Sequence, residues 1–461
     1  MRCGLALTLP SLLLGFAGCS LLTSLDGLHS GDASPVDGSA DVADEPLPPP
    51  KPTCDPSAKP STSAIFVSPT GDDTLAGTAA APVKTLAVAL SLAKAQSATD
   101  VYIDEGTYSE AVAIASPTTL HGGWKAQGAN WSKDCSDTVV GATIVRSPTT
   151  QAVAAKGFTG AAGLDTLTLV TKAQGASGES GIAVLVSGAG IAFTINGVDL
   201  TAATGGDGTT PPTPPPTGNT TCNGLSSCAD GAQGATGGAG TPAPTGSFGA
   251  NGFTAASAGG GLGGGPGHNG TAGTAGETQT GCVNSCGAAP GCASGPATGT
   301  NSGGTGTCGC GGVGGTGGGA GTSGGASVGV YVFGATLTID QSTVRAGHGG
   351  AGAPGANGGG GGAGTTGAAG ASSFCAGSCA YDGSQCILTG TSLFGGGAGG
   401  HGGPGGVGGT GGGGAGGPSY GIVYTGGAVA NIGTATAIQV GAGGKGASGA
   451  PDGASSATFK P

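Results

Sequence analysis

The chain has 461 residues, of which 109 are glycine and 28 are proline, so these two types fill about 30% of the positions. Only 8% of the residues are charged, 4% are aromatic, and the net charge is −11. This acidic balance excludes a nucleic-acid-binding protein, because neutralising phosphates requires a basic surface. The 37% hydrophobic content argues against a disordered chain, which typically has few apolar residues.

The N-terminus has the layout of an export signal. Arg2 precedes the apolar run Leu5–Phe16, which is too short to span a bilayer. The stretch Phe16-Ala17-Gly18-Cys19 resembles a bacterial lipobox, with Phe16 at the position where that motif usually has Leu. The resemblance implies that residues 1–18 are removed as a lipoprotein signal peptide and that Cys19 is lipidated. The alternative is an ordinary cleaved signal followed by an incidental cysteine.

Residues 19–60 are predicted to form a lipidated cysteine followed by a disordered acidic tether. Seven acidic residues and the run Pro46–Pro50 lie in this segment, which has little periodic hydrophobicity. We expect an exported, lipid-anchored protein of the outer membrane or cell surface, since Ser20 replaces the Asp that retains some lipoproteins at an inner membrane. The expected partners are the membrane, through the N-terminal lipid, and envelope or extracellular polysaccharide or other surface proteins.

Cysteine usage is consistent with export. The chain contains 14 cysteines, and the loss of Cys3 with the signal and of Cys19 to the lipid leaves 12, an even number. Cys54 and Cys135 bracket the first folded region and are candidates to pair. The disulfide candidates are Cys54, Cys135, Cys222, Cys228, Cys282, Cys286, Cys292, Cys308, Cys310, Cys375, Cys379 and Cys386. Two Cys-x3-Cys pairs among them resemble zinc half-sites, but no His follows at ligand spacing, so disulfides are favoured and no metal or cofactor is expected.

The first folded region begins with a short strand, a turn and a helix. The strand is Ile65-Phe66-Val67, and Pro82 interrupts the chain before an apolar, alanine-rich stretch that runs to Ala95. Thr85 is the candidate N-cap of this helix. Short strands separated by tight turns follow, around Val101–Ile103 and Val112–Ile114.

This order of motifs, FVSPTGDD, GT, APVKTL, VYIDEGTYSEAV and LHGGW, resembles the N-terminal signature of pectin-lyase-like proteins, in particular a DUF1565-type group of bacterial surface proteins. The resemblance covers residues 64–131 and implies a right-handed parallel β-helix. It also implies that the helix covers the N-terminal end of the solenoid, where strand edges and apolar core would otherwise meet solvent.

Three similar segments occur farther along the chain, as expected for additional coils. Gly181-Ile182-Ala183-Val184 aligns with Gly329-Val330-Tyr331-Val332 and with Gly421-Ile422-Val423-Tyr424. Each copy is followed by a glycine-rich tract, so one coil plus one insertion is the predicted repeating unit. Alternate apolar residues would face the core, and the insertions would leave from one turn and gather on one side.

The glycine-rich tracts have a period of three residues. Between Gly395 and Gly414 the other residues recur at every third position, which is the polyproline-II period and allows packed polyglycine-II helices. Collagen requires more proline, and calcium-binding repeats require regular aspartates, so both are disfavoured. The tracts are also similar in composition to those of PGRS-like surface proteins. The alternative is a set of flexible linkers.

Candidate catalytic residues are few. Asp72 and Asp73 form the best potential metal pair, followed by Asp104, Glu105 and Glu110, but turn hydrogen bonds explain the first two better. A polysaccharide lyase or hydrolase would need acids and a base on one face of the solenoid, and the set to test is Asp165, Glu179, Arg146 and Lys172. Glycan binding without catalysis would need exposed aromatic rings, and the candidates are Trp124, Trp131, Tyr331, Tyr420 and Tyr424. No residue is assigned as catalytic.

The predicted fold is therefore all-β, a right-handed parallel β-helix with a short N-terminal capping helix and long glycine-rich insertions. The predicted segments are 1–18 for the signal, 19–60 for the tether, 61–200 for N-terminal coils, 201–326 for a Gly/Pro/Cys-rich insertion, 327–345 for a coil, 346–418 for a second insertion and 419–461 for the C-terminal coil and tail. The predicted function is a non-enzymatic structural or adhesive role at the cell surface. The alternatives are a polysaccharide lyase or hydrolase and a non-catalytic glycan binder.

Overall fold

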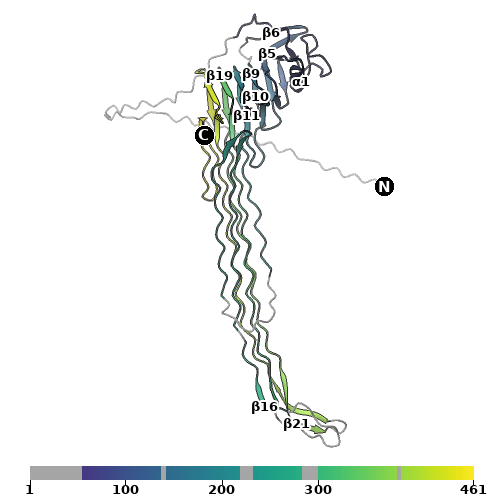
Figure 1. Ribbon diagram of the computed structural model, residues 1–461, viewed down its shortest axis with the longest axis vertical. Helices are drawn as coiled ribbons and strands as arrows, with labels where there is room; N and C mark the ends of the chain where they lie inside the picture. Colours follow the sequence, from purple (N-terminus) through teal and green to yellow (C-terminus); the bar gives the residue numbers. More distant parts are fainter. Residues whose placement is uncertain (1–53, 137–141, 219–231, 272, 283–298, 382–385) are drawn as a thin grey trace, which may run out of the picture. The chain divides into compact units, whose positions relative to one another are not determined.

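Three parallel sheets wind into a β-helix in the computed structural model, which describes residues 54–136, 142–218, 232–271, 273–282, 299–381 and 386–461 (Figure 1). Successive coils each add one strand to sheet 1, then to sheet 2, then to sheet 3. This arrangement confirms the prediction of an all-β, parallel β-helical fold.

The strands of each sheet come from widely separated parts of the chain. Sheet 1 contains β1 (Ile65–Val67), β2 (Asp100–Asp104), β5 (Thr119–Gln127), β9 (Gly160–Asp165), β12 (Ile191–Asn196), β19 (Thr336–Asp340) and β24 (Val429–Ile432), and β6 (Asn130–Lys133) pairs antiparallel with β5. Sheet 2 contains β3 (Gly106–Tyr108), β7 (Thr143–Arg146), β10 (Thr168–Val170), β13 (Asp199–Thr201), β20 (Thr343–Ala346) and β25 (Ala437–Val440). Sheet 3 contains β4 (Val112–Ile114), β8 (Gln151–Lys156), β11 (Gly181–Ser187), β18 (Ser327–Phe333), β23 (Ser419–Thr425) and β26 (Ser455–Phe459).

The inward-facing side chains of successive coils stack into one continuous apolar core. In sheet 1, Phe193 is in register with Leu337, and Ile195 is in register with Ile339. All four side chains are at most 1% exposed. Because parallel strands in register place like side chains on the same face, each coil buries its alternate residues against the next coil.

Helix α1 (Leu86–Gln96) covers the N-terminal end of this core. The side chain of Thr85 accepts a hydrogen bond from the backbone N–H of Val88, so the predicted N-cap is confirmed. Leu86, Ala89 and Ala93 are buried in the same cluster as the β-helix core. Within the residues that the structure describes, no helix has both the length and the apolarity to cross a bilayer.

The pairing of the repeated segments corrects one detail of the sequence alignment. Gly329 is aligned with Gly421, as predicted, because Val330 pairs with Ile422. Gly181 instead pairs with Ser327, two residues before Gly329. A shift of two residues preserves which side chains face the core, so apolar alternation could not distinguish the two registers.

All the long insertions leave the β-helix between a strand of sheet 2 and the next strand of sheet 3. They connect β13 to β18, β20 to β23 and β25 to β26. The prediction that the insertions leave from one turn is therefore confirmed, and their tracts run side by side (Figure 1). The tracts are joined by antiparallel hairpins, namely β14 (Ser247–Gly249) with β15 (Gly252–Thr254), β16 (Thr278–Cys282) with β17 (Gly299–Ser302) and β21 (Ser373–Tyr381) with β22 (Cys386–Leu393).

Candidate functional site

A row of polar side chains crosses the outer face of sheet 1. His121 on β5 is in register with Asp165 on β9, and Asp165 is in register with Asn196 on β12. His121 Nε2 lies 2.9 Å from Asp100 Oδ1, and its Nδ1 lies 3.3 Å from Asp165 Oδ2. The ammonium group of Lys133 lies 3.3 Å from the same Asp165 oxygen. We call Asp100, His121, Lys133, Asp165 and Asn196 the sheet-1 polar cluster.

The charges in this cluster shift the pKa values of its members. Burial alone would raise the pKa of Asp165, but hydrogen bonding to His121 and the charge of Lys133 outweigh it and lower the pKa to about 2. Burial alone would lower the pKa of His121, but its hydrogen bonds to Asp100 and Asp165 outweigh burial and raise it. The hydrogen bond to His121 also lowers the pKa of Asp100. A protonated imidazole held between two carboxylates is therefore favoured.

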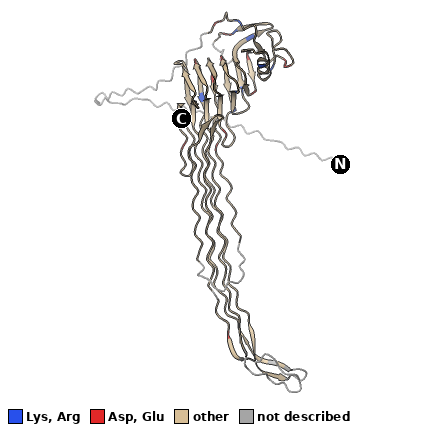
Figure 2. Cartoon of the chain, viewed as in Figure 1, with Lys and Arg blue, Asp and Glu red and all other residues tan. Residues whose placement is uncertain are grey.

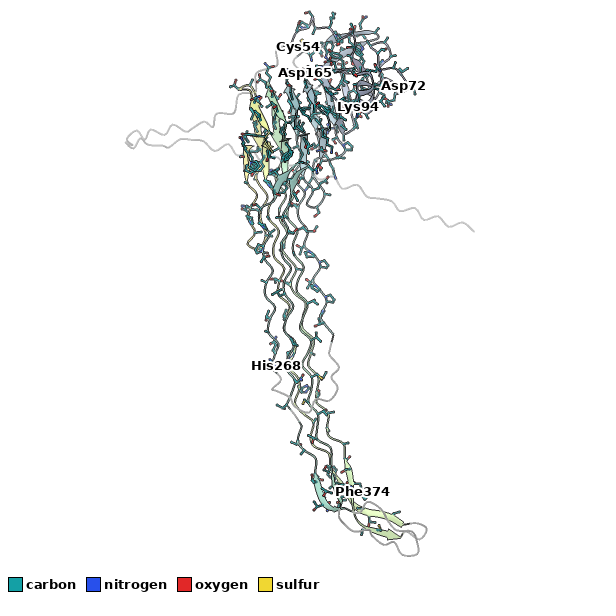
Figure 3. All side chains as sticks on the ribbon, viewed as in Figure 1. Cys54, Asp72, Lys94, Asp165, His268 and Phe374 are labelled. Carbon is teal, nitrogen blue, oxygen red and sulfur yellow. A yellow bond between two sulfur atoms is a disulfide. The ribbon has the colours of Figure 1, made fainter. Side chains whose placement is uncertain are left out.

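The cluster is partly covered by a second, smaller apolar core outside the β-helix. Phe66, Tyr102, Trp124 and Trp131 are all buried there, and the ring of Tyr102 stacks on that of His121 at 5.0 Å. Strand β6 brings Trp131 over sheet 1, where its indole N–H donates to the carbonyl of Ala79. The side chains of the cluster's ionisable members remain between 11% and 27% exposed. Solvent reaches the charged groups, and Figure 3 labels Asp165 on this part of the β-helix.

The acidic residues of the N-terminal turns are used in local structure. Asp72 accepts hydrogen bonds from the backbone and hydroxyl of Thr74, and these bonds lower its pKa. Asp73 accepts from the backbone N–H groups of Lys84 and Thr85, just before α1. Glu110 accepts from the backbone N–H groups of the first two helical residues, at 2.9 and 3.0 Å. The carboxylates of Asp73 and Glu110 therefore stabilise the N-terminus of α1, where the helix dipole favours negative charge.

Asp104 and Glu105 also have structural partners. Asp104 is buried and accepts hydrogen bonds from the hydroxyl of Ser68 and from the backbone N–H of Ala126. Glu105 forms an ion pair with Lys125. In the part of the chain that the structure describes, no group of three or more His, Cys, Asp and Glu side chains could hold a metal ion.

The four residues proposed for polysaccharide chemistry do not come together. Asp165 belongs to the sheet-1 polar cluster, whereas Arg146 and Lys172 line a groove of about 560 Å³ beside sheet 2. Glu179 accepts hydrogen bonds from the backbone N–H of Ala176 and the hydroxyl of Thr150, both at 2.7 Å. These hydrogen bonds, and to a smaller extent the charge of Lys172, lower the pKa of Glu179. Asp165 is therefore on a different face of the solenoid from Arg146 and Lys172, whereas Glu179 is near Lys172.

The aromatic candidates for glycan binding are mostly buried. Trp124, Trp131, Tyr331 and Tyr420 are at most 5% exposed, so their faces are not available for stacking on sugar rings. The hairpin β14–β15 folds back onto the outer face of sheet 3, where Phe248 stacks on Tyr331 with the ring centroids 5.6 Å apart. Lys460 covers Tyr424, with its ammonium 5.7 Å from the ring centroid.

The glycine-rich tracts form an ordered bundle held by backbone hydrogen bonds. We define the glycine bundle as residues 204–218, 232–246, 255–271, 273–277, 303–326, 347–372 and 394–418. In the last tract every third residue donates to one neighbouring tract: Gly402, Gly405, Gly408, Gly411 and Gly414 donate to the carbonyls of Thr365, Gly362, Gly359, Ala356 and Ala353. The next residues, Gly403, Gly406, Gly409 and Gly412, donate to His268, Gly265, Leu262 and Gly259 of another tract.

The period of three in the sequence therefore corresponds to a polyglycine-II lattice. A third tract donates in turn from Gly234, Gly237 and Gly240 to the carbonyls of Pro404, Val407 and Thr410. The accepting residues Pro404, Val407 and Thr410 have exposed side chains. His401 has the same position in the repeat, and its Nδ1 lies 3.3 Å from the hydroxyl of Thr366 on the adjacent tract. Of the two arrangements considered for the tracts, the structure has the ordered one rather than the flexible one.

Glycine is required inside the bundle because the neighbouring backbones are too close for a side chain. A Cβ atom at Gly361 would lie 2.2 Å from the carbonyl oxygen of Gly405, and one at Gly405 would lie 1.9 Å from that of Val313. At Gly360 the nearest atom would be 3.9 Å away, on Pro216. Figure 2 shows that charged residues are concentrated in the β-helix and are sparse along the tracts.

The cysteines are found in both regions. Cys54 and Cys135 form a disulfide across 81 residues, and it ties the start of the described chain to the segment after β6. Cys308, Cys310, Cys375 and Cys379 are also disulfide-bonded. Cys282 and Cys386 lie at ends of β16 and β22. The other candidates, Cys19, Cys222, Cys228, Cys286 and Cys292, lie outside the described residues.

Comparison with known proteins agrees with this geometry. Residues 69–177 match the family model DUF1565, described as a protein of unknown function. DUF1565 is a pectin-lyase-like β-helix family, so the match and the parallel sheets support the same fold. The DUF1565 segment extends from the turn before α1 to the loop after β10, and it includes every ionisable member of the sheet-1 polar cluster. No curated protein and no solved structure matches the chain.

Two features of the candidate sites were not found by sequence reasoning. The pairing of His121 with Asp100 and Asp165 depends on the register between strands that are 21 and 44 residues apart in sequence. Alternating polar residues on β5 and β9 indicate an outward face but not which residues are neighbours. The docking of Phe248 on sheet 3 was missed because this short apolar segment lies within a glycine-rich insertion.

Proposed function

We propose that the protein is a non-enzymatic structural or adhesive protein of the cell surface, exported and anchored by a lipid on Cys19. The observation that supports this proposal best is the glycine bundle, whose tracts are hydrogen-bonded to several neighbours at intervals of three residues. Such a lattice can build an extended body from sequence that has almost no side chains to bury. It offers backbone and small apolar groups for contact and few groups for chemistry.

The dimensions and composition of the bundle suit a spacer. A tract of 24 residues, such as 303–326, extends about 75 Å in a polyproline-II-like conformation. Hairpin β21–β22 follows the tract 347–372, and Figure 3 labels Phe374 on this hairpin. On this hairpin Phe374 is 41% exposed and Ile387 38%, and Phe394, the first residue after β22, is 68% exposed. We propose that the bundle holds this apolar hairpin away from the β-helix so that it can contact polysaccharide or proteins of the envelope.

The test compares two variants. The first, called the tip variant, changes the exposed apolar side chains in and directly after hairpin β21–β22, and the second is a control. The tip variant carries Phe374→Ser, Ile387→Ser and Phe394→Ser, and the control carries Leu75→Ser and Leu262→Ser, which are also exposed apolar residues. Cells that export the full chain are scored for surface labelling and for binding to immobilised envelope polysaccharides and envelope proteins. We expect binding to fall at least tenfold in the tip variant only. Equal binding by both variants, or a chain that is inaccessible at the surface, would contradict the proposal.

Anchoring is tested separately in the same cells. Cys19→Ala is expected to abolish incorporation of a labelled fatty acid and to release the chain from the membrane fraction. Retention of both properties in this variant would exclude Cys19 as the lipid site, without affecting the adhesion result.

Polysaccharide cleavage by a lyase or a hydrolase is a second candidate, and the sheet-1 polar cluster is the observation that favours it. Two carboxylates, an imidazole and an ammonium group lie together on a face that solvent reaches. The full chain is incubated with acidic and neutral polysaccharides plus calcium, and new reducing ends or unsaturated products are measured. Cleavage that is lost in Asp165→Asn would establish an enzyme and overturn the non-enzymatic proposal.

A further inference from the structure

The groove beside sheet 2 lies on the side where the glycine-rich insertions leave the β-helix. It is lined mainly by the ends of β7, β10 and β13 and by the turns that follow these strands. Its volume of about 560 Å³ is within the range of small-ligand sites, about 300–1,000 Å³. The groove is therefore large enough for a small ligand or for a short segment of a polymer.

The strand register places three outward-facing residues in a row along this groove. Val170 is in register with Arg146 on one side and with Thr201 on the other, and all three line the groove. Leu169 and Leu200, the residues just before Val170 and Thr201, are 0% exposed. Because successive side chains of a strand point to opposite faces, the row lies on the outer face of the sheet.

Two cationic side chains line the groove from adjacent coils. Arg146 is the last residue of β7, and Lys172 follows the end of β10 by two residues. Both residues are exposed. The backbone N–H of Lys172 donates to the carbonyl of Thr149 at 2.9 Å, so the turn after β10 lies against the turn after β7. This contact keeps the two cations on the same part of the surface.

The acidic side chains near these cations are occupied by other partners. Asp199 forms an ion pair with Arg345. Glu179 accepts hydrogen bonds from a backbone N–H and a hydroxyl, and the charge of Lys172 contributes less than these bonds to its lowered pKa. Among the described residues, neither Arg146 nor Lys172 forms an ion pair. The groove therefore carries positive charge that the chain itself does not neutralise.

We propose that this groove binds an anionic group of a glycan, a carboxylate or a phosphate, through Arg146 and Lys172. The planar guanidinium of Arg146 suits two-point recognition of such a group, and Lys172 adds a second positive charge. The hydroxyl of Thr201 and the apolar surface of Val170 suit the hydroxyls and C–H groups of a sugar ring. A nucleic acid or a strongly acidic peptide would instead be repelled by the net charge of −11. This inference is independent of the proposed adhesive role, whose contact is at hairpin β21–β22.

Isothermal titration calorimetry of the purified full chain in neutral detergent tests this inference. The probes are a hyaluronan oligosaccharide, which carries carboxylates, a phosphorylated manno-oligosaccharide, and the same manno-oligosaccharide without phosphate. We expect an anionic probe to bind with a dissociation constant below about 1 mM, and the neutral probe to bind at least tenfold more weakly. Binding of either anionic probe supports the inference, and the tighter of the two identifies the anionic group. Arg146→Gln and Lys172→Gln are each expected to weaken this binding at least tenfold.

The matched control is Lys156→Gln, which removes the same charge from an exposed position at the end of β8 in sheet 3. Far-UV circular dichroism shows that each variant is folded. Failure of both anionic probes to bind the wild-type chain would overturn the inference. So would an equal loss of binding in Lys156→Gln, which would show a non-specific charge effect. Binding that is lost in the tip variant and kept in Arg146→Gln would place the glycan contact at the hairpin and also overturn it.

Discussion

The β-helix and the glycine bundle are ordered by opposite means. In the β-helix, large side chains such as Phe193 and Leu164 are buried in a continuous core, and the backbone pairs at the spacing of a β-sheet. In the bundle, the absence of side chains lets the tracts approach until each backbone bonds to several neighbours. The difference shows that a glycine-rich sequence can be ordered where its period matches a hydrogen-bond lattice, although ordering glycine is costly in entropy.

Removing a core side chain should give the largest effect, and it should act on the β-helix. Phe193 is 1% exposed, and Phe193→Ala is expected to lower the free energy of unfolding of the β-helix by about 4 kcal/mol, through lost burial and the cavity that remains. Leu75→Ala, at a 41% exposed position, is the control, with an expected change of less than about 0.5 kcal/mol. Denaturant unfolding followed by far-UV circular dichroism measures both. Similar values for the two variants would show that the core is not what stabilises this region.

Adding one methyl group inside the glycine bundle should disrupt the bundle and leave the β-helix intact. Gly361→Ala is expected to cost about 2 kcal/mol locally, because its Cβ would collide with the backbone of Gly405 and separate the tracts. Gly360→Ala is the matched control one residue away, where the new Cβ meets only ordinary contacts. Hydrogen exchange at residues 402–414 should accelerate in the first variant alone, while the core of the β-helix keeps its protection. Equal exchange in both variants would argue against a close-packed lattice.

Substitution in the sheet-1 polar cluster should have a smaller effect on the free energy of unfolding. This effect should depend on pH and be confined to the β-helix. The pKa of His121 is raised. Its contribution to the free energy of unfolding is therefore complete below about pH 6.5 and is lost as the pH rises through the raised pKa. The pKa of Asp165 is lowered to about 2. Its contribution to the free energy of unfolding is therefore present above about pH 4 and is lost as the pH falls toward 2. His121→Asn is therefore expected to destabilise the β-helix most between about pH 4 and 6.5, by about 2 kcal/mol, the usual size of a lost hydrogen bond to a charged group.

Unfolding free energies of wild type and His121→Asn, measured from pH 3 to pH 9, test the cluster. Lys125→Gln, which removes an exposed ion pair with Glu105, serves as a control with a small effect at every pH. A difference between His121→Asn and wild type that did not vary with pH would show that the imidazole acts through packing on Tyr102 alone.

Local signals in the sequence were sufficient for several elements and insufficient for others. Thr85 and the apolar spacing after it indicate a capped helix because capping depends on residues within one turn. The period of three in the tracts indicates the lattice but not the partners of each tract, since a repeated sequence is compatible with any register. The contacts of Asp165 and of Phe248 depend on residues from other coils or insertions, and only the folded chain brings these together.

The shared turn from which the insertions leave has a consequence for how such proteins can vary. Tracts 347–372 and 394–418 run antiparallel and are joined by one hairpin, and each donates hydrogen bonds at every third residue. A gain or loss of three residues in both tracts would move the hairpin by about 9 Å and leave the donors facing the same neighbours. A change of one residue would direct every later donor toward the wrong neighbour. Insertions and deletions among homologues should therefore occur in matched multiples of three, and reach could evolve by such length changes while the β-helix stays constant.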